Sequence, residues 1–189
     1  MSARILVYLA AGAEELETVS TVDVLRRAGV EVTVASVGGD EEGVVECSRG
    51  VWLGGDRPWA EGLAEEYDGV VVPGGMGGVK ALMAEEGVLR EIRAAWDAGK
   101  WVAAICAGPM VLDKAGVLAG RRFTCYPGCE AGLEGECTGG ATCVDGRLVT
   151  GKGAGVALDF ALELAAQVAG AEKAWKVAEG MQARWPAEG

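Results

Sequence analysis

The chain has 189 residues, of which 50% are hydrophobic and 24% charged, and its 28 acidic and 17 basic residues give a net charge of −11. This size and balance predict one globular domain over residues 1–189 and exclude a disordered chain. The acidic surplus argues against nucleic acid or an anionic membrane surface as the main partner. Because histidine is absent, Ser-His-Asp triads, Cys-His dyads and histidine metal ligands are also excluded.

The first element is predicted to be a buried strand, since residues 5–9 form a short, wholly apolar run. Together with Arg4 and the following Ala11-Gly12-Ala13, the run imitates a signal peptide, but acidic residues follow too early for one. No apolar run reaches the roughly 18 residues of a membrane span. The six cysteines are spread irregularly, which favours a reducing cytoplasm over a disulfide-bonded secreted protein.

A helix is predicted next, because apolar residues recur at helical spacing from residue 16 to residue 28. Acidic residues in its first turn, arginines in its last turn and Gly29 just beyond match the rules for helix ends. The alternating Val30, Val32 and Val34 then predict a second strand, which completes a βαβ unit.

The remaining elements alternate in the same way. After the second strand we expect a polar loop (38–43) and a hairpin or small excursion (44–53). Strands are then predicted at 70–72, 101–105 and 122–125, and helices near 79–84, 88–98 and 109–115. A glycine-rich segment of unassigned structure (127–140) is followed by a hairpin (142–144 and 148–150) and by helices at 156–169 and 172–184. Strands that alternate with helices predict a doubly wound α/β fold, a parallel sheet with helices on both faces.

Ligands of such folds bind at the carboxyl ends of the strands, where residues 11–17, 73–78 and 106–109 are expected. Ala104-Ile105-Cys106-Ala107-Gly108 has the pattern of a strand–nucleophile–helix elbow with cysteine as the nucleophile. Amides at the start of a helix stabilise a thiolate and make it reactive. The alternative is a buried, inert cysteine.

Two further features fit a site around Cys106. Glu17, in the first turn of the first helix, would be protonated beside a sulfur and could act as general acid and base. Alternatively, Glu17 only stabilises the helix through interaction with its dipole, a role that is expected for Glu14 and Glu15 in particular. Pro73-Gly74-Gly75 could offer backbone amides to an oxyanion, although an ordinary turn explains the same residues.

Other kinds of site receive weaker support. Cys125, Cys129, Cys137 and Cys143 could supply four zinc ligands, but their spacings lack paired CxxC knuckles. The glycine-rich stretches at 74–78 and 151–155 complete neither a dinucleotide fingerprint nor a Walker motif. We therefore expect neither a metal nor a cofactor.

Several motifs in order along nearly the whole chain resemble the ThiJ/PfpI superfamily, and more closely its DJ-one branch, that of the Parkinsonism-associated protein deglycase. The resemblance rests on residues 13–17, 22–29, 47–49, 73–75, 103–109, 150–153 and 160–162, which read AEELE, VDVLRRAG, CSR, PGG, AAICAGP, TGKG and FAL. It implies a flavodoxin-like sandwich (class I glutamine-amidotransferase-like) that forms a homodimer.

The same resemblance implies roles for single residues. Cys106 would be the oxidation-prone nucleophile and Glu17 its protonated partner, while the amides of Gly74, Gly75 and Ala107 would bind the oxyanion. Arg27 and Arg49 match arginines near the pocket and the dimer contact. Protease relatives have histidine directly after the nucleophile, where this chain has Ala107, so protease activity is disfavoured.

The chain departs from the family at Tyr126, where some close members have a histidine near the pocket. A tyrosine can donate a hydrogen bond but is a poor base at neutral pH, so proton transfer would fall to Glu17. The resemblance implies detoxification of methylglyoxal and glyoxal, or removal of their early adducts from Cys, Lys and Arg side chains. The alternatives are a redox sensor or chaperone that acts through oxidation of Cys106, and an unrelated amidase or hydratase.

Overall fold

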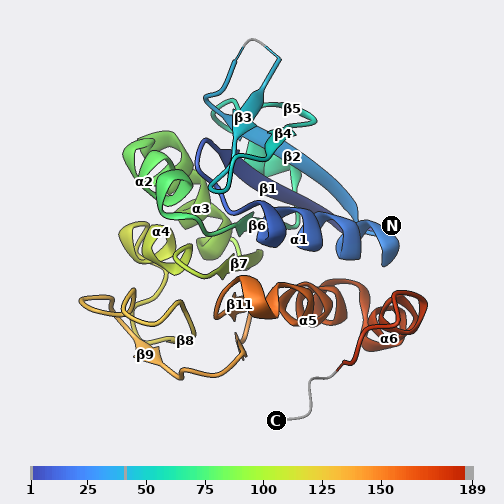
Figure 1. The fold of residues 1–189 in the computed structure, drawn as a ribbon. Coiled ribbons are helices and arrows are strands. Elements are labelled where there is room, and N and C mark those ends of the chain that lie inside the picture. Colours follow the sequence, from blue (N-terminus) through green and yellow to red (C-terminus); the bar gives the residue numbers. More distant parts are fainter. Residues whose placement is uncertain (1, 41, 186–189) are drawn as a thin grey trace.

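Seven strands form one sheet in the order β10-β11-β7-β6-β1-β2-β5 in the computed structural model, which describes residues 2–40 and 42–185 (Figure 1). Neighbouring strands run parallel except at the β10–β11 edge, which is an antiparallel hairpin. The strands are β1 (Arg4–Ala10), β2 (Glu31–Val37), β5 (Arg57–Pro58), β6 (Gly69–Val72), β7 (Trp101–Ile105), β10 (Thr142–Asp145) and β11 (Leu148–Gly151).

Helices cover both faces of this sheet (Figure 1). The layer on one face consists of α1 (Glu15–Arg27), α5 (Ala157–Ala169) and α6 (Ala171–Gly180), and that on the other of α2 (Met76–Ala84), α3 (Glu86–Asp97) and α4 (Pro109–Lys114). Strand β1 serves both layers because successive side chains alternate: Ile5, Val7 and Leu9 face α1 and α5, whereas Leu6 and Tyr8 face the other layer. The prediction of a flavodoxin-like, doubly wound fold is confirmed.

Most predicted elements are present, and the differences lie at the edges. The excursion at 44–53 is a small antiparallel pair, β3 (Val44–Glu46) and β4 (Trp52–Gly54). The edge strand β5 was not predicted, because two residues, one of them a proline, are too few to show the alternation of apolar and polar residues that indicates a strand. The last helix ends at Gly180 rather than near residue 184, because glycine is a poor helix former and the chain then turns so that the rings of Trp185 and Trp175 meet edge to face at 5.3 Å.

The strand predicted at 122–125 is the two-residue strand β8 (Arg122–Phe123), which pairs in parallel with β9 (Glu136–Cys137) of the glycine-rich segment 127–140. Elsewhere in the described chain lie two 3₁₀ turns, η1 (Leu63–Glu66) and η2 (Ala154–Val156). Residue 41 of the predicted loop 38–43, and residues 1 and 186–189 of the predicted domain, lie outside the described residues. Of the helices that the structure describes, none has the length and apolar character that a membrane crossing requires.

Candidate active site

Two loops meet backbone to backbone at the carboxyl end of the sheet, and glycines make this approach possible. A Cβ on Gly12, in the loop after β1, would lie 2.7 Å from Cα of Gly77 at the start of α2. Gly75 has φ +86, and a Cβ there would collide with the carbonyl oxygen of Gly12. Because Glu14 N–H donates to the Gly74 carbonyl at 2.9 Å, the first turn of α1 is held against the loop after β6.

The residue after β7 has the backbone of a nucleophile elbow. Cys106 has φ +63, a left-handed conformation that is uncommon outside glycine and clusters at functional sites. Its N–H donates to the Gly151 carbonyl at 2.9 Å, so the neighbouring strand β11 holds the turn. A Cβ on Gly108 would lie 2.6 Å from the Val72 carbonyl oxygen, so only glycine fits two residues after the cysteine.

Glu17 reaches this elbow from α1 and is completely buried. Its Oε2 accepts the Gly74 N–H at 2.8 Å, whereas Oε1 has no hydrogen-bond partner of ordinary geometry among the described residues. Burial, with the nearby charge of Glu14, raises the pKa of Glu17 to about 7, and hydrogen bonds from Gly74 and Cys106 oppose that rise. The carboxyl group is thus poised to hold or release a proton near neutral pH.

The Cys106 thiol adjoins both this carboxyl group and two backbone amides. Burial, followed by the charge of Glu17 and the hydrogen bond with it, raises the pKa of Cys106 to about 12, while the amides of Ala107 and Gly75 act in the opposite direction. The first proton to leave the pair is therefore that of the carboxyl group, and the Cys106 thiol stays protonated beside the Glu17 carboxylate near neutral pH. When Glu17 is protonated its charge no longer opposes the thiolate, and the two amides remain to stabilise negative charge on sulfur.

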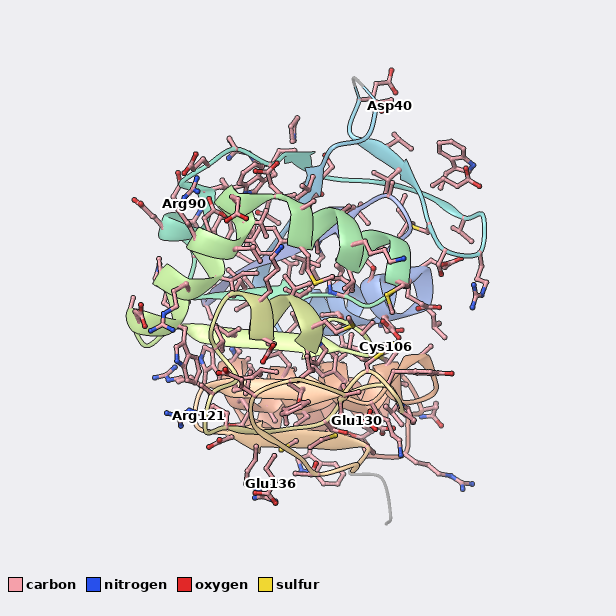
Figure 2. The ribbon with its side chains drawn as sticks, turned by 90° about the vertical axis from the view of Figure 1, so that its left-hand side faces the viewer. Asp40, Arg90, Cys106, Arg121, Glu130 and Glu136 are labelled. Carbon is pink, nitrogen blue, oxygen red and sulfur yellow. The ribbon has the colours of Figure 1, made fainter. Side chains whose placement is uncertain are left out.

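The structure therefore brings together Cys106, Glu17, Gly75 and Ala107, and it gives Gly74 a different contact from the one expected. The Gly74 amide, expected to face an oxyanion, donates to Glu17 instead. A Cβ on Gly74 would lie 2.5 Å from both Cβ of Cys106 and Oε2 of Glu17, so this glycine lies between the two side chains. Figure 2 shows Cys106 at the edge of the sheet, above the loop that carries Glu130.

Tyr126 lies beside the site and is about half exposed. Its N–H donates to the Cys106 carbonyl at 2.9 Å. A Cβ on Gly153 would lie 3.4 Å from the Tyr126 ring and 3.9 Å from Sγ of Cys106, so Gly153 faces both groups. The half-exposed Tyr126 ring therefore lies at the rim of the site.

The two arginines have separate positions. Arg49 lies near the start of α1, where its N–H donates to Glu15 at 2.9 Å. Arg27 pairs with Asp23 at 2.8 Å in the last turn of α1, about ten residues and so about 15 Å along the helix from Glu17. Within this chain, Arg27 therefore does not join the Cys106 site.

Sequence reasoning missed the supporting role of two acids. The Glu14 side chain caps α1 by accepting the Glu17 N–H at 2.7 Å, and Glu15 accepts the Ser48 hydroxyl at 2.9 Å. The spacing of three residues from Glu14 to Glu17 is that of a helix cap, and it could have identified the first role. Nothing local indicates the second, because Ser48 comes from the β3–β4 excursion.

The zinc alternative finds no support in the described ranges, where no three Cys, Asp or Glu side chains are arranged to hold a metal ion. The four cysteines at 125–143 are all unpaired thiols in the structure.

Comparisons with known proteins show which family the chain belongs to. Residues 3–167 match the model of the DJ-1/PfpI family. The chain is 43% identical to protein dj-1beta of Drosophila melanogaster, over 96% of this chain and 97% of that protein. The crystal structure of Drosophila melanogaster DJ-1beta superposes on this chain with a TM-score of 0.91, and the superposition covers 98% of this chain and 100% of that one.

Two more distant relatives are also informative. A Caenorhabditis elegans protein named glutathione-independent glyoxalase DJR-1.2 is 34% identical over 85% of this chain and 86% of that protein. A structure of Toxoplasma gondii DJ-1 described as oxidized is 36% identical with a TM-score of 0.87, and covers 97% of this chain and 100% of that one. The chain belongs to the DJ-1/PfpI family.

Proposed function

We propose that this protein consumes reactive dicarbonyls, methylglyoxal and glyoxal, or removes their early adducts from Cys, Lys and Arg side chains, through Cys106. The observation that carries the proposal is a thiol on a strained elbow with a buried carboxyl group of pKa about 7 on one side and two backbone amides on the other. A relative at 34% identity is named a glutathione-independent glyoxalase, which supports the same reaction class.

In the first step Sγ of Cys106 attacks the aldehyde carbon of methylglyoxal while the thiol proton passes to Glu17. The resulting oxyanion lies within reach of the Gly75 and Ala107 amides, which act as an oxyanion hole. Protonated Glu17 then returns the proton to this oxygen, which gives a neutral hemithioacetal. The Tyr126 hydroxyl donates a hydrogen bond to the adjacent ketone oxygen.

In the second step the Glu17 carboxylate removes the hydrogen of the former aldehyde carbon as a proton and delivers it to the neighbouring carbon. The hydroxyl proton on the former aldehyde oxygen passes to the former ketone oxygen, which becomes the lactoyl hydroxyl. This internal redox shift leaves a lactoyl thioester on Cys106, with no external oxidant or reductant. Water then cleaves the thioester, which releases lactate and a proton and regenerates the thiol. A carboxyl with a pKa of about 7 suits both transfers, because it gives and takes protons readily at neutral pH.

The test is lactate release from methylglyoxal, without glutathione or added metal, by wild type, Cys106→Ser and Glu17→Gln. We expect turnover only by wild type, and full turnover by the matched thiol control Cys143→Ser. Activity retained by Cys106→Ser would contradict the proposal. Glyoxal, with glycolate as the product, serves as a second substrate.

The alternative is a redox sensor or chaperone in which Cys106 is oxidised to a sulfinate without turnover. This alternative is supported by the relative from Toxoplasma gondii, whose structure is described as oxidized. Mass analysis after mild peroxide treatment separates the two functions: a gain of two oxygen atoms at Cys106 alone, in a protein that releases no lactate, supports the sensor.

We further propose that the protein is a cytoplasmic homodimer. Leu16 and Val19 of α1 and Val51 and Trp52 of the β3–β4 excursion are exposed apolar side chains, and Val19 and Leu53 line one cavity. Such a patch is suited to a second copy of the chain. Sedimentation should give twice the chain mass, and Trp52→Glu should reduce it to that of one chain. No nucleic acid partner is expected for a chain of net charge −11.

A further inference from the structure

Two thiols lie together in the segment that follows the elbow, outside the Cys106–Glu17 site. Cys137 is opposite Phe123 in the β8–β9 pair, and Thr138 N–H donates to the Phe123 carbonyl at 2.7 Å. Cys125 follows Phe123 by two residues and is 2% exposed, whereas Cys137 is partly exposed and packs against the same core cluster. The short strand pair thus holds the buried and the accessible thiol at one place.

The two thiols pack in the same core cluster as Phe123, the residue opposite Cys137 in the strand pair, and the Cys125 thiol also reaches Oε2 of Glu130 at 3.9 Å. Burial raises the pKa of Cys125 to about 12, helped first by the charge of Cys137 and then by a hydrogen bond between the two thiols. The charge of Cys129 also raises the pKa of Cys125, without a hydrogen bond between them, and the charge of Cys137 raises the pKa of Cys143 in the same way. The strand register and this contact together place the Cys125 thiol beside that of Cys137.

We propose that Cys125 and Cys137 form a second redox site, which is oxidised to an intramolecular disulfide by exchange with a low-molecular-weight disulfide such as oxidised glutathione. The site is separate from Cys106 and does not depend on the proposed dicarbonyl activity. Its reaction is thiol–disulfide exchange, in which one disulfide is consumed and another is formed.

The steps follow from the exposure of the two thiols. The accessible Cys137 attacks one sulfur of the external disulfide, which forms a mixed disulfide and releases one thiol. The buried Cys125 then attacks Sγ of Cys137, which forms the internal disulfide and releases the second thiol. Both cysteine protons leave with the two released thiols, so two cysteines are oxidised and one external disulfide is reduced.

The experiment is incubation of the whole folded protein with oxidised glutathione, followed by blocking of free thiols and mass mapping of the peptides. Wild type and Cys106→Ser should both lose two hydrogen atoms and contain a Cys125–Cys137 link. In Cys125→Ser we expect glutathione to remain attached to Cys137, at least about tenfold more than in wild type, because the thiol that displaces it is missing. Cys137→Ser should form no internal disulfide.

The matched controls are Cys129→Ser and Cys143→Ser, which should form the link to the same extent as wild type. Circular dichroism of each serine variant shows that it is folded before exchange is scored. A link from Cys137 to Cys129 or Cys143, or stable glutathione on Cys137 in the wild type with Cys125 still free, would overturn the proposal.

Discussion

The Gly74 amide donates to Oε2 of Glu17 at 2.8 Å, and this bond joins the loop after β6 to the first turn of α1. It satisfies one oxygen of a fully buried carboxyl group and leaves the other without a partner of ordinary geometry among the described residues. A buried carboxylate is costly when it is incompletely hydrogen-bonded, so protonation is favoured. The same contact places the carboxyl group of Glu17 beside Cys106, where it can take up the thiol proton and return it.

The stability of the protein should therefore fall as the pH rises through the titration of Glu17. The pKa of Glu17 is about 7 in the folded protein against 4.5 for the free side chain, so the folded state binds more protons than the unfolded state between these values. In Glu17→Gln the amide does not titrate. Relative to wild type, the variant should gain about 2–3 kcal/mol of unfolding free energy between about pH 4.5 and pH 8.

Urea unfolding of both proteins at several pH values measures this difference. Glu163→Gln, at a partly exposed side chain of α5, is the control and should show no comparable trend. A difference between wild type and Glu17→Gln that is the same at all pH values would mean that Glu17 is ionised when buried.

The rate of dicarbonyl consumption should have the opposite dependence on pH. The reactive form of the Cys106–Glu17 pair carries one negative charge, and the pair loses its first proton near pH 7. We expect kcat/KM for methylglyoxal to rise about tenfold for each pH unit below about 7 and to level off above it. Steady-state lactate release between pH 5.5 and 9 tests this, and a flat profile through neutrality would assign the proton transfers to another group.

The sequence was sufficient to predict the elements that position the site. Strand β7 has the predicted bounds, and the elbow at Cys106 and the acid at Glu17 follow the carboxyl ends of β7 and β1, the two strands on either side of β6. Local patterns could not indicate that the Gly74 amide is occupied by Glu17, because that bond joins residues 57 positions apart. The motif match placed Arg27 near the pocket, whereas the structure confirms the predicted position of Arg27 in the last turn of α1, at the opposite end from Glu17.

The glycine-rich segment from 122 to 140 shows where periodicity carries no information. Its structure is a two-residue strand pair and turns fixed by long-range contacts, such as the Thr124 hydroxyl on the Gly140 carbonyl at 2.7 Å. The presence of four cysteines in residues 125–143 left a zinc site open although their spacing argued against one, and in the fold the Cys125 thiol contacts Cys137 and Glu130.

Gly74 should tolerate no side chain. An added Cβ would be 2.5 Å from both Cys106 and Glu17, which must then separate. Gly74→Ala should cost about 1–3 kcal/mol of unfolding free energy and lower lactate release at least about tenfold, since displaced reacting groups lose rate steeply. Gly155→Ala, where a Cβ would meet nothing within 4 Å, is the control and should be nearly neutral in both measurements. Wild-type activity in a folded Gly74→Ala protein would contradict the close approach of these three residues.

Tyr126 offers the sharpest test of how this chain manages without a histidine beside the thiol. Its ring lies next to Gly153 and Cys106 and is half exposed, so removing the hydroxyl should change the unfolding free energy by less than about 0.5 kcal/mol. If the hydroxyl donates to the substrate ketone, Tyr126→Phe should lower kcat/KM for methylglyoxal about tenfold, the value of one hydrogen bond. The alkylation rate of Cys106 by iodoacetamide, which needs no such donor, should stay within twofold of wild type. Equal loss in both assays would mean instead that the Tyr126 ring positions the elbow.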